Sequence, residues 1–220
     1  MMKYQCNPLA RLGMTAMLLI AAVALSPADP VELVSPNAQD IGFFGMAVAG
    51  IEDINGNSRG DVIIGAYRES GATTIRMGRV YIFEGSTGYL IRTLVSPNSQ
   101  SNGRFGSSVA DVPDVNGDGH PDIVVGAPGE DEGWGRVYLF DGTNGNVLQT
   151  IEFPDKEATA SGRMGLSVTG IPDLSGDGRG DIAAGYGDSI MAWVPGPGGV
   201  LIFNGATGAL IHSLESPNPE

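Results

Sequence analysis

Short apolar runs alternate with clusters of Gly, Asn and Asp along most of the chain. In its middle the runs are rich in Val, Ile, Tyr and Phe and cover residues 107–114, 122–128, 136–142 and 146–153. Runs of this length, bounded by turn-forming residues, are typical of β-strands. The sequence DGTNG between the last two runs predicts a hairpin turn. No sustained 3.6-residue period follows residue 28, so the pattern predicts an all-β fold.

The same four runs occur three times. DVIIGAY, DIVVGAP and DIAAGYG begin at residues 61, 122 and 181, and GRVYIFEG, GRVYLFDG and GGVLIFNG follow them in turn. Four strands repeated about every 60 residues predict a β-propeller-type array of three four-stranded antiparallel blades. The predicted blades cover 29–94, 95–151 and 152–214, and residues 215–220 repeat the start of a truncated fourth unit.

Three blades are too few for a ring, because propellers usually close with about four to eight blades. The chain is therefore predicted to be a partial or truncated propeller. Two alternatives remain: copies associate as a homo-oligomer that closes the ring, or the array stays open with edges prone to association.

An acidic loop separates the first and second strands of each unit. Oxygen-bearing side chains occupy its positions 1, 3, 5 and 9, and position 7 offers a backbone carbonyl. A tight glycine-containing loop can turn these oxygens inward, which suits Ca²⁺ because this cation takes six to eight oxygen ligands. The predicted ligands are Asp53, Asn55, Asn57, Arg59 (carbonyl) and Asp61; Asp114, Asn116, Asp118, His120 (carbonyl) and Asp122; and Asp173, Ser175, Asp177, Arg179 (carbonyl) and Asp181.

The first loop supplies two carboxylates and the other two supply three each, so we expect the first site to bind calcium most weakly. A simple turn is the structural alternative, since Asx residues also bond to their own backbone. An EF-hand is excluded because position 12 holds Ile64, Val125 or Ala184 where that motif needs Glu.

The first and third loops also contain Arg-Gly-Asp, a tripeptide that cell-surface receptors bind. Asp61 and Asp181 are predicted metal ligands at the start of a strand, whereas the side chains of Arg59 and Arg179 are expected to extend into solvent. We therefore predict that neither copy is an adhesion signal.

The N-terminus predicts export. Lys3 and Arg11 precede the apolar stretch 12–25, and small residues allow cleavage near Ala28, so residues 1–28 have the pattern of a signal peptide. Its removal would leave no membrane-inserted segment, and an uncleaved anchor is the alternative. The expected location is secreted, cell-surface or periplasmic. The single cysteine, Cys6, lies in this segment, so calcium is expected to stabilise loops in place of disulfides.

Phe105-Gly106, the loop 114–122 and Gly126-Ala127-Pro128 resemble an FG-GAP repeat. Such repeats build the seven-bladed propeller of integrin α subunits and occur in many exported bacterial proteins, the type that this chain resembles. The resemblance covers about 31–214 and departs in the third unit, which has Met164-Gly165. It implies calcium in all three loops and ligand binding on the opposite face.

The composition limits the chemistry. A net charge of −13 argues against nucleic acid as a partner. After residue 28 the chain has two histidines and no cysteine, so we expect no enzyme activity, although a glycosidase-like carboxylate pair stays open. The second connections of the units carry Trp134 and Trp193, which suit partner recognition or packing against blade edges.

The sequence therefore predicts an exported calcium-binding β-propeller repeat protein that acts as an interaction or adhesion module. Its expected partner is a protein or polysaccharide bound on the face opposite the calcium loops. The alternative is an accessory, non-catalytic domain of a secreted hydrolase whose catalytic part is absent from this chain.

Overall fold

A computed structural model describes residues 31–156, 162–187 and 198–215 of the chain. The predicted signal peptide 1–28 and residues 216–220 lie outside these ranges. Within them, the chain forms twelve strands and one three-residue 3₁₀ turn, η1 (Asp131–Gly133). No helix of the described ranges is long and apolar enough to cross a membrane.

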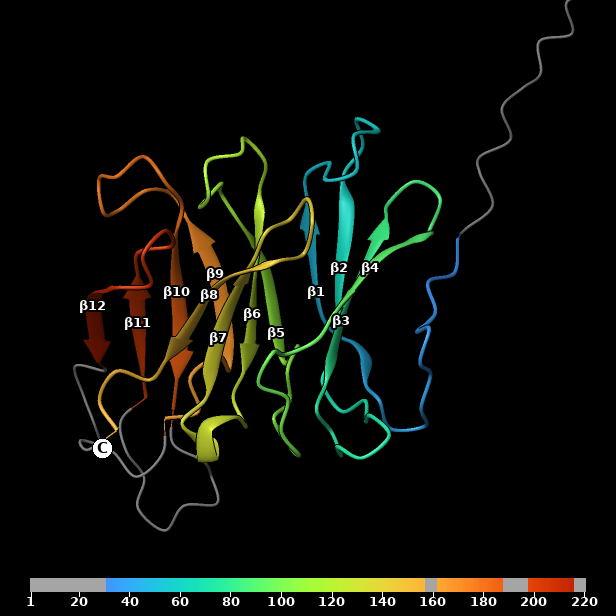
Figure 1. The fold of residues 1–220 in the computed structure, drawn as a ribbon, viewed down its shortest axis with the longest axis horizontal. Helices are drawn as coiled ribbons and strands as arrows, with labels where there is room; N and C mark the ends of the chain where they lie inside the picture. Colours follow the sequence, from blue (N-terminus) through green and yellow to red (C-terminus); the bar gives the residue numbers. More distant parts are fainter. Residues whose placement is uncertain (1–30, 157–161, 188–197, 216–220) are drawn as a thin grey trace, which may run out of the picture. The chain divides into compact units, whose positions relative to one another are not determined.

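The twelve strands form three four-stranded antiparallel sheets, and in each sheet the spatial order follows the chain order (Figure 1). This confirms the predicted all-β array of three blades. The first blade contains β1 (Phe44–Ile51), β2 (Asp61–Ala66), β3 (Arg79–Glu84) and β4 (Leu90–Leu94). The second contains β5 (Ser108–Val112), β6 (Asp122–Ala127), β7 (Arg136–Phe140) and β8 (Val147–Glu152). The third contains β9 (Ser167–Ile171), β10 (Asp181–Tyr186), β11 (Gly199–Phe203) and β12 (Leu210–Glu215).

The hydrophobic core lies between consecutive blades. Successive side chains of a strand point to opposite faces of the sheet. An apolar run such as Ile123–Val125 therefore packs against both neighbouring blades. Ile123 and Val125 pack with Ile63 of the first blade, and Val124 packs with Ile182 of the third. All five side chains are at most 5% exposed, and burying each contributes about 1.5–3 kcal/mol. The middle blade is therefore apolar on both faces.

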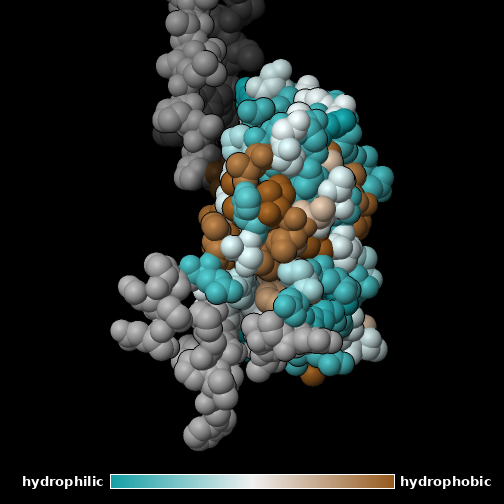
Figure 2. Space-filling model, turned by 90° about the vertical axis from the view of Figure 1, so that its left-hand side faces the viewer, coloured by the Kyte–Doolittle hydropathy of each residue, from teal (hydrophilic) through white to brown (hydrophobic). Residues whose placement is uncertain are grey.

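The third blade leaves uncovered the face that the first two blades bury. Leu214 is 53% exposed, whereas the equivalent residues Leu94 and Ile151 are 3% and 4% exposed. Val200 and Ile202 on the same face are only half-buried. Figure 2 shows apolar atoms gathered on the side of the molecule where β11 and β12 lie. The array thus ends on an apolar sheet face.

A buried carboxylate joins the chain segment before the first blade to that blade. The side chain of Glu69, which is 0% exposed, accepts hydrogen bonds from the hydroxyls of Ser35 and Tyr81 and, at 3.2 Å, from the amide of Asn37. The guanidinium of Arg79 lies 3.5 Å from the same carboxylate. A buried charge is tolerated when it is paired and hydrogen-bonded in this way.

An equivalent set of buried hydrogen bonds, here called a polar joint, connects the first and second blades. Tyr138 donates a hydrogen bond to the buried carboxylate of Glu130 and accepts hydrogen bonds from Ser96 at 3.2 Å and Asn98 at 3.3 Å. Burial raises the pKa of Glu130, and burial together with the hydrogen bond to Glu130 raises the pKa of Tyr138 to about 12. Tyr138 therefore stays protonated and acts as the donor.

The joint between the second and third blades is apolar instead. Phe153 stands where the earlier joint has Ser96, and Leu201 stands where it has Tyr138. Both are buried in one cluster, and the ring of Phe153 packs against Trp134 and Tyr186 at centroid distances of 5.6 and 5.3 Å. The hydroxyl pair of one joint is thus replaced by an apolar pair at the next.

Replacing Tyr138 with Phe tests the polar joint. The variant leaves a fully buried carboxylate without its hydroxyl donor, so we expect the free energy of unfolding in urea to fall by about 1.5–3 kcal/mol. Tyr89→Phe is the matched control because Tyr89 is 74% exposed, and its effect should stay within about 0.5 kcal/mol. Equal effects of the two changes would contradict the assignment.

Candidate metal centres

The first loop of each blade holds its oxygen-bearing side chains against its own backbone. In the second blade the carboxylate of Asp114 accepts hydrogen bonds from the N–H groups of Gly117 and, at 2.8 Å, Gly119. Asn116 and Asp118 accept hydrogen bonds from the N–H groups two residues further on, at 2.8 and 2.9 Å. Positive φ angles of 85° at Gly117 and 86° at Gly119 let the loop curl around these oxygens. The side chains at positions 1, 3 and 5 thereby bond to the backbone of their own loop, and their role as calcium ligands stays a prediction.

The other two loops repeat this arrangement. Asp53 accepts hydrogen bonds from the N–H groups of Gly56 at 2.7 Å and Asn57 at 3.1 Å, and Asp173 accepts them from Gly176 at 2.6 Å and Gly178 at 2.8 Å. These bonds place the remaining predicted side chains, those of Asn55, Asn57, Ser175 and Asp177, on the same turns.

The ninth residue of each loop is a buried aspartate at the start of the second strand. Asp61, Asp122 and Asp181 are at most 2% exposed. One oxygen of Asp122 accepts the N–H of Val115 at 2.8 Å in the loop, and the other accepts the N–H of Gly142 at 3.1 Å in the β7–β8 hairpin. Asp61 and Asp181 make the equivalent pairs of bonds. Each aspartate therefore ties its loop to the hairpin beside it.

The hairpin glycine in this tie has no room for a side chain. A Cβ on Gly142 would lie 2.1 Å from the carbonyl oxygen of Pro121, the eighth residue of the loop. Gly85 and Gly205 meet the carbonyls of Gly60 and Gly180 at 2.3 and 2.1 Å in the same way. The backbones of loop and hairpin thus touch directly in all three blades.

One further residue in each blade, which the loop pattern did not predict, reaches the loop. It begins the turn of the hairpin after the third strand, and it is Glu84, Asp141 or Asn204. The amide of Asn57 donates to Glu84 at 2.7 Å, and that of Asn116 donates to Asp141 at 3.2 Å. The signal was present in the sequence, because EGSTG, DGTNG and NGATG all start with an oxygen-bearing side chain.

Negative charge is concentrated around the second loop. Burial, together with the nearby carboxylates of Asp118 and Asp141, raises the pKa of Asp122 to about 6, although hydrogen bonds from Val115 and Gly142 oppose the rise. Burial also opposes ionisation of Asp114, but backbone N–H groups and the guanidinium of Arg179 outweigh it and lower the pKa of Asp114. The carboxylates crowd together, and a cation would relieve their repulsion.

The donor chemistry of these loops fits a hard cation. Each loop offers carboxylate, amide or hydroxyl oxygens and a carbonyl, which are the groups that Ca²⁺ takes. Among the described residues no three His, Cys, Asp or Glu side chains form a group that could hold a metal ion by themselves. Amide, hydroxyl and backbone oxygens would therefore have to complete each site.

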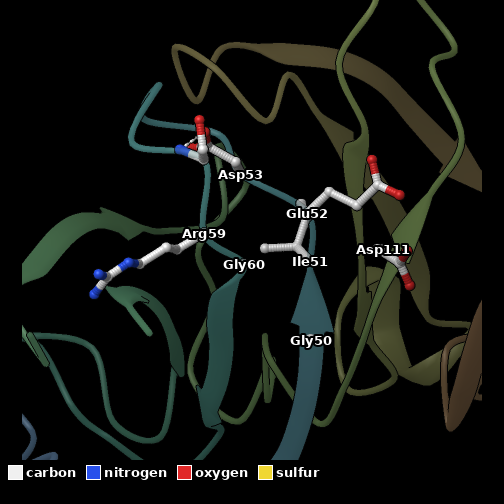
Figure 3. Close-up of a pocket in the computed structure, with 8 residues that line it drawn as sticks. Gly50, Ile51, Glu52, Asp53, Arg59, Gly60 and Asp111 are labelled. Atoms are coloured by element: carbon white, nitrogen blue, oxygen red, sulfur yellow. Dashed lines mark hydrogen bonds between the residues drawn. The ribbon is translucent and has the colours of Figure 1, made fainter. Parts of the chain in front are cut away.

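The carboxylates of both Arg-Gly-Asp copies are buried, because Asp61 and Asp181 are 2% and 0% exposed. The arginines differ from each other. Arg59 is exposed and points away from Glu52 and Asp111, two acidic residues that line the same depression of about 490 Å³ (Figure 3). The expectation that Arg179 also extends into solvent is wrong. Its guanidinium lies 3.7 Å from Asp114 of the preceding blade, because the first strands of neighbouring blades pack together.

The opposite end of the blades has a different character. There the second connection of one blade bonds to the start of the next through backbone groups, as in Phe105 N to Met77 O at 2.9 Å and Met164 N to Trp134 O at 2.9 Å. Trp134 is half-buried against Phe153, so its side chain packs between blades. Trp193, the other predicted recognition residue, lies outside the described residues.

Three matched blades, each with an oxygen-lined loop tied to a hairpin, define a repeat protein of the β-propeller type. Residues 105–145 match the family model described as FG-GAP repeat. The chain is 38% identical to human integrin alpha-11 over 168 residues, 32% identical to integrin alpha-2 of Bos taurus over 160 residues, and 34% identical to integrin alpha-6 of Gallus gallus over 154 residues. It is an FG-GAP repeat protein, similar to integrin α subunits.

These alignments cover 70%, 69% and 68% of this chain, and the chain spans 14% of each relative. The bacterial type of the family stays a prediction, since these relatives are animal proteins. Among solved structures, the Dos1 propeller has a TM-score of 0.47 at 11% identity, covering 79% of this chain and 36% of that one. A rhamnogalacturonan lyase PL11 of Bacillus licheniformis has a TM-score of 0.47 at 13% identity, covering 86% and 38%. The blade architecture rests on the sheet order and register rather than on these two likenesses.

Replacing Gly142 with Ala tests the contact between loop and hairpin. The added methyl group would overlap the carbonyl of Pro121, so the hydrogen bonds of Asp122 must shift. We therefore expect the free energy of unfolding in urea to fall by about 1–3 kcal/mol relative to the unaltered chain. Gly50→Ala is the control, because a Cβ there has no neighbour within 4 Å. If both variants unfold like the unaltered chain, the backbones do not touch as described.

Proposed function

We propose that the chain is a calcium-binding interaction module that works outside the cytoplasm. The observation that carries this proposal is the threefold recurrence of an oxygen-lined loop closed by a buried aspartate. Asp61, Asp122 and Asp181 occupy the same place in three blades whose remaining sequence varies. The signal-peptide pattern of residues 1–28 supports export, and the proposal assigns no catalytic step to the chain.

In this proposal the side chains at positions 1, 3, 5 and 9 and the carbonyl at position 7 hold one Ca²⁺ in each loop. The bound cation would neutralise the carboxylates that crowd around each loop. It would also fix the loop against the hairpin, as disulfides hold loops in place in many exported proteins. The mature chain contains no cysteine that could provide it.

We place the partner at the end of the blades opposite the calcium loops, and we propose an acidic protein or polysaccharide. Arg104 and Arg163 line one depression of about 220 Å³ there, between the second and third blades. Among the described residues no ion pair or hydrogen bond engages either guanidinium. Their φ angles of 57° and 43° match that of Phe43, 56°, at the equivalent position of the first blade, so the turn before each first strand presents this side chain in the same way.

Calcium should raise the thermal stability of the chain. With a dissociation constant of about 10⁻⁴–10⁻³ M, each site contributes about 0.4–1.4 kcal/mol at roughly 1 mM calcium. Three sites then add about 1–4 kcal/mol, which corresponds to a rise in Tm of about 3–15 °C for a chain of this size. Differential scanning calorimetry with calcium, with chelator and with magnesium measures the effect.

Magnesium is the control, because it demands a smaller octahedral cage and keeps several of its waters. A Tm that is the same in calcium and in chelator would reduce the loops to simple turns. A rise of equal size in magnesium would show a divalent-cation site without calcium preference.

Binding to an immobilised panel of matrix proteins and acidic polysaccharides tests the partner end. We expect the double change R104E and R163E to weaken a detected interaction by tenfold or more, because charge-assisted hydrogen bonds contribute about 1.5–3 kcal/mol each. Arg59→Glu is the control at the calcium end, where within the described ranges no ion pair engages the exposed Arg59 side chain. If Arg59→Glu alone abolishes binding, the partner occupies the loop end instead.

A further inference from the structure

One residue at the end of the third strand touches the predicted cation loop in every blade. It is Glu84 in the first blade, Asp141 in the second and Asn204 in the third. Its backbone is fixed by the hairpin, since the N–H of each residue donates across the turn at 2.9 Å, to Tyr89, Asn146 and Ala209 respectively. Asp141 and Asn204 are also largely buried, at 6% and 9% exposure. The side chain is therefore held against the loop.

The hydrogen-bonding character of this residue is complementary to that of its loop. Asn57 in the first loop and Asn116 in the second each have an amide group with one oxygen and one nitrogen. Only the oxygen can bind a cation, so the nitrogen has to be held away from the cation site. Glu84 accepts a hydrogen bond from the amide nitrogen of Asn57, and Asp141 accepts one from the amide nitrogen of Asn116. The oxygens of the same two amides face the loop backbone, where they accept N–H groups at 2.8 Å.

The third loop has the opposite arrangement. Its positions 3 and 5 are Ser175 and Asp177, which contain no amide nitrogen, and the hairpin residue is an amide instead. The nitrogen of Asn204 donates to Ser175 at 2.8 Å and to Asp177 at 2.7 Å. In the first two blades the loop thus supplies the donor and the hairpin the acceptor, whereas in the third blade the hairpin supplies the donor and the loop two acceptors.

The identity of the hairpin residue also changes the number of carboxylates at each site. The first loop has two carboxylates, and Glu84 brings a third. The second loop has three, and Asp141 brings a fourth, whereas the third loop has three and Asn204 adds none. The hairpin residue thus restores to the first site the carboxylate that Asn57 lacks. A ranking from the loops alone, with the first site weakest, omits this contribution.

We propose that Glu84, Asp141 and Asn204 are positioning residues that orient the cation-binding oxygens of the adjacent loop and set the charge of each site. This inference rests on the proposed calcium sites and adds a group outside the nine-residue loop to each of them. It brings the carboxylate count of the first site level with that of the third and gives the second site a fourth carboxylate, although Arg179 already pairs with Asp114 there. Groups that hold metal ligands in place commonly change metal affinity by about 10–100-fold when they are removed.

Calorimetric calcium titration of the full chain and of E84Q and D141N tests the proposal. Each variant should weaken one of the three sites by about tenfold or more. The E84Q effect should vanish in a chain that already carries D53N, because both changes act on the first site. D111N is the matched control, since Asp111 is an exposed carboxylate at the same end that lines the loop depression without contacting a predicted ligand.

The change N204D should act in the opposite direction. It loses two donated hydrogen bonds and adds a fourth carboxylate to the third site, so we expect a lower Tm in chelator and a larger rise on adding calcium. A purely structural role would lower both melting temperatures equally. D141E keeps the charge and should retain most of the calcium affinity that D141N loses.

The outcomes separate the two proposals. If the unaltered chain binds no calcium, the proposed function fails and this inference fails with it. If it binds calcium and E84Q, D141N and D111N all bind equally well, the calcium sites stand and the positioning role is overturned.

Discussion

The structure depends on one recurring interaction, a buried aspartate at the start of the second strand of each blade. Asp122 uses one oxygen for the N–H of Val115 in the loop and the other for the N–H of Gly142 in the hairpin. Two separate connections are thereby held at one end of a sheet. A buried carboxylate is costly unless such donors surround it, so the glycine of the hairpin and the shape of the loop follow from its presence.

The two ends of the blades are built by different means, and this difference separates their roles. At the loop end each loop is tied to its own hairpin through side-chain oxygens, and side chains such as Arg179 also reach the preceding blade. At the other end backbone hydrogen bonds run from one blade to the next, as between Phe105 and Met77. A cation at the first end would therefore act on one loop and its hairpin, whereas a ligand at the second end would meet a surface built by backbone bonds between two blades.

Much of the fold was predictable because the same pattern of strands and turns occurs three times in the sequence. The runs proposed for the middle unit contain β5 to β8, and the loops and hairpins were both recognised from their turn residues. Contacts between those segments were not predictable. The approach of Glu84 to Asn57 depends on the pairing of Asp61 with Glu84 across β2 and β3. The approach of Arg179 to Asp114 depends on how two blades pack, which no pattern within one repeat encodes.

The difference between the polar joints and the apolar joint has a consequence for assembly of the chain during synthesis. Repeats with nearly identical sequences risk docking in the wrong order. In the blade that bears the Glu130–Tyr138 pair, Ser96 and Asn98 donate hydrogen bonds to the hydroxyl of Tyr138, and against Phe153 that buried hydroxyl would lose both donors. Conversely, Leu201 offers nothing to a serine hydroxyl. The chemistry of the joints thus distinguishes the third blade, which follows an apolar joint, from the first two blades, which follow polar ones.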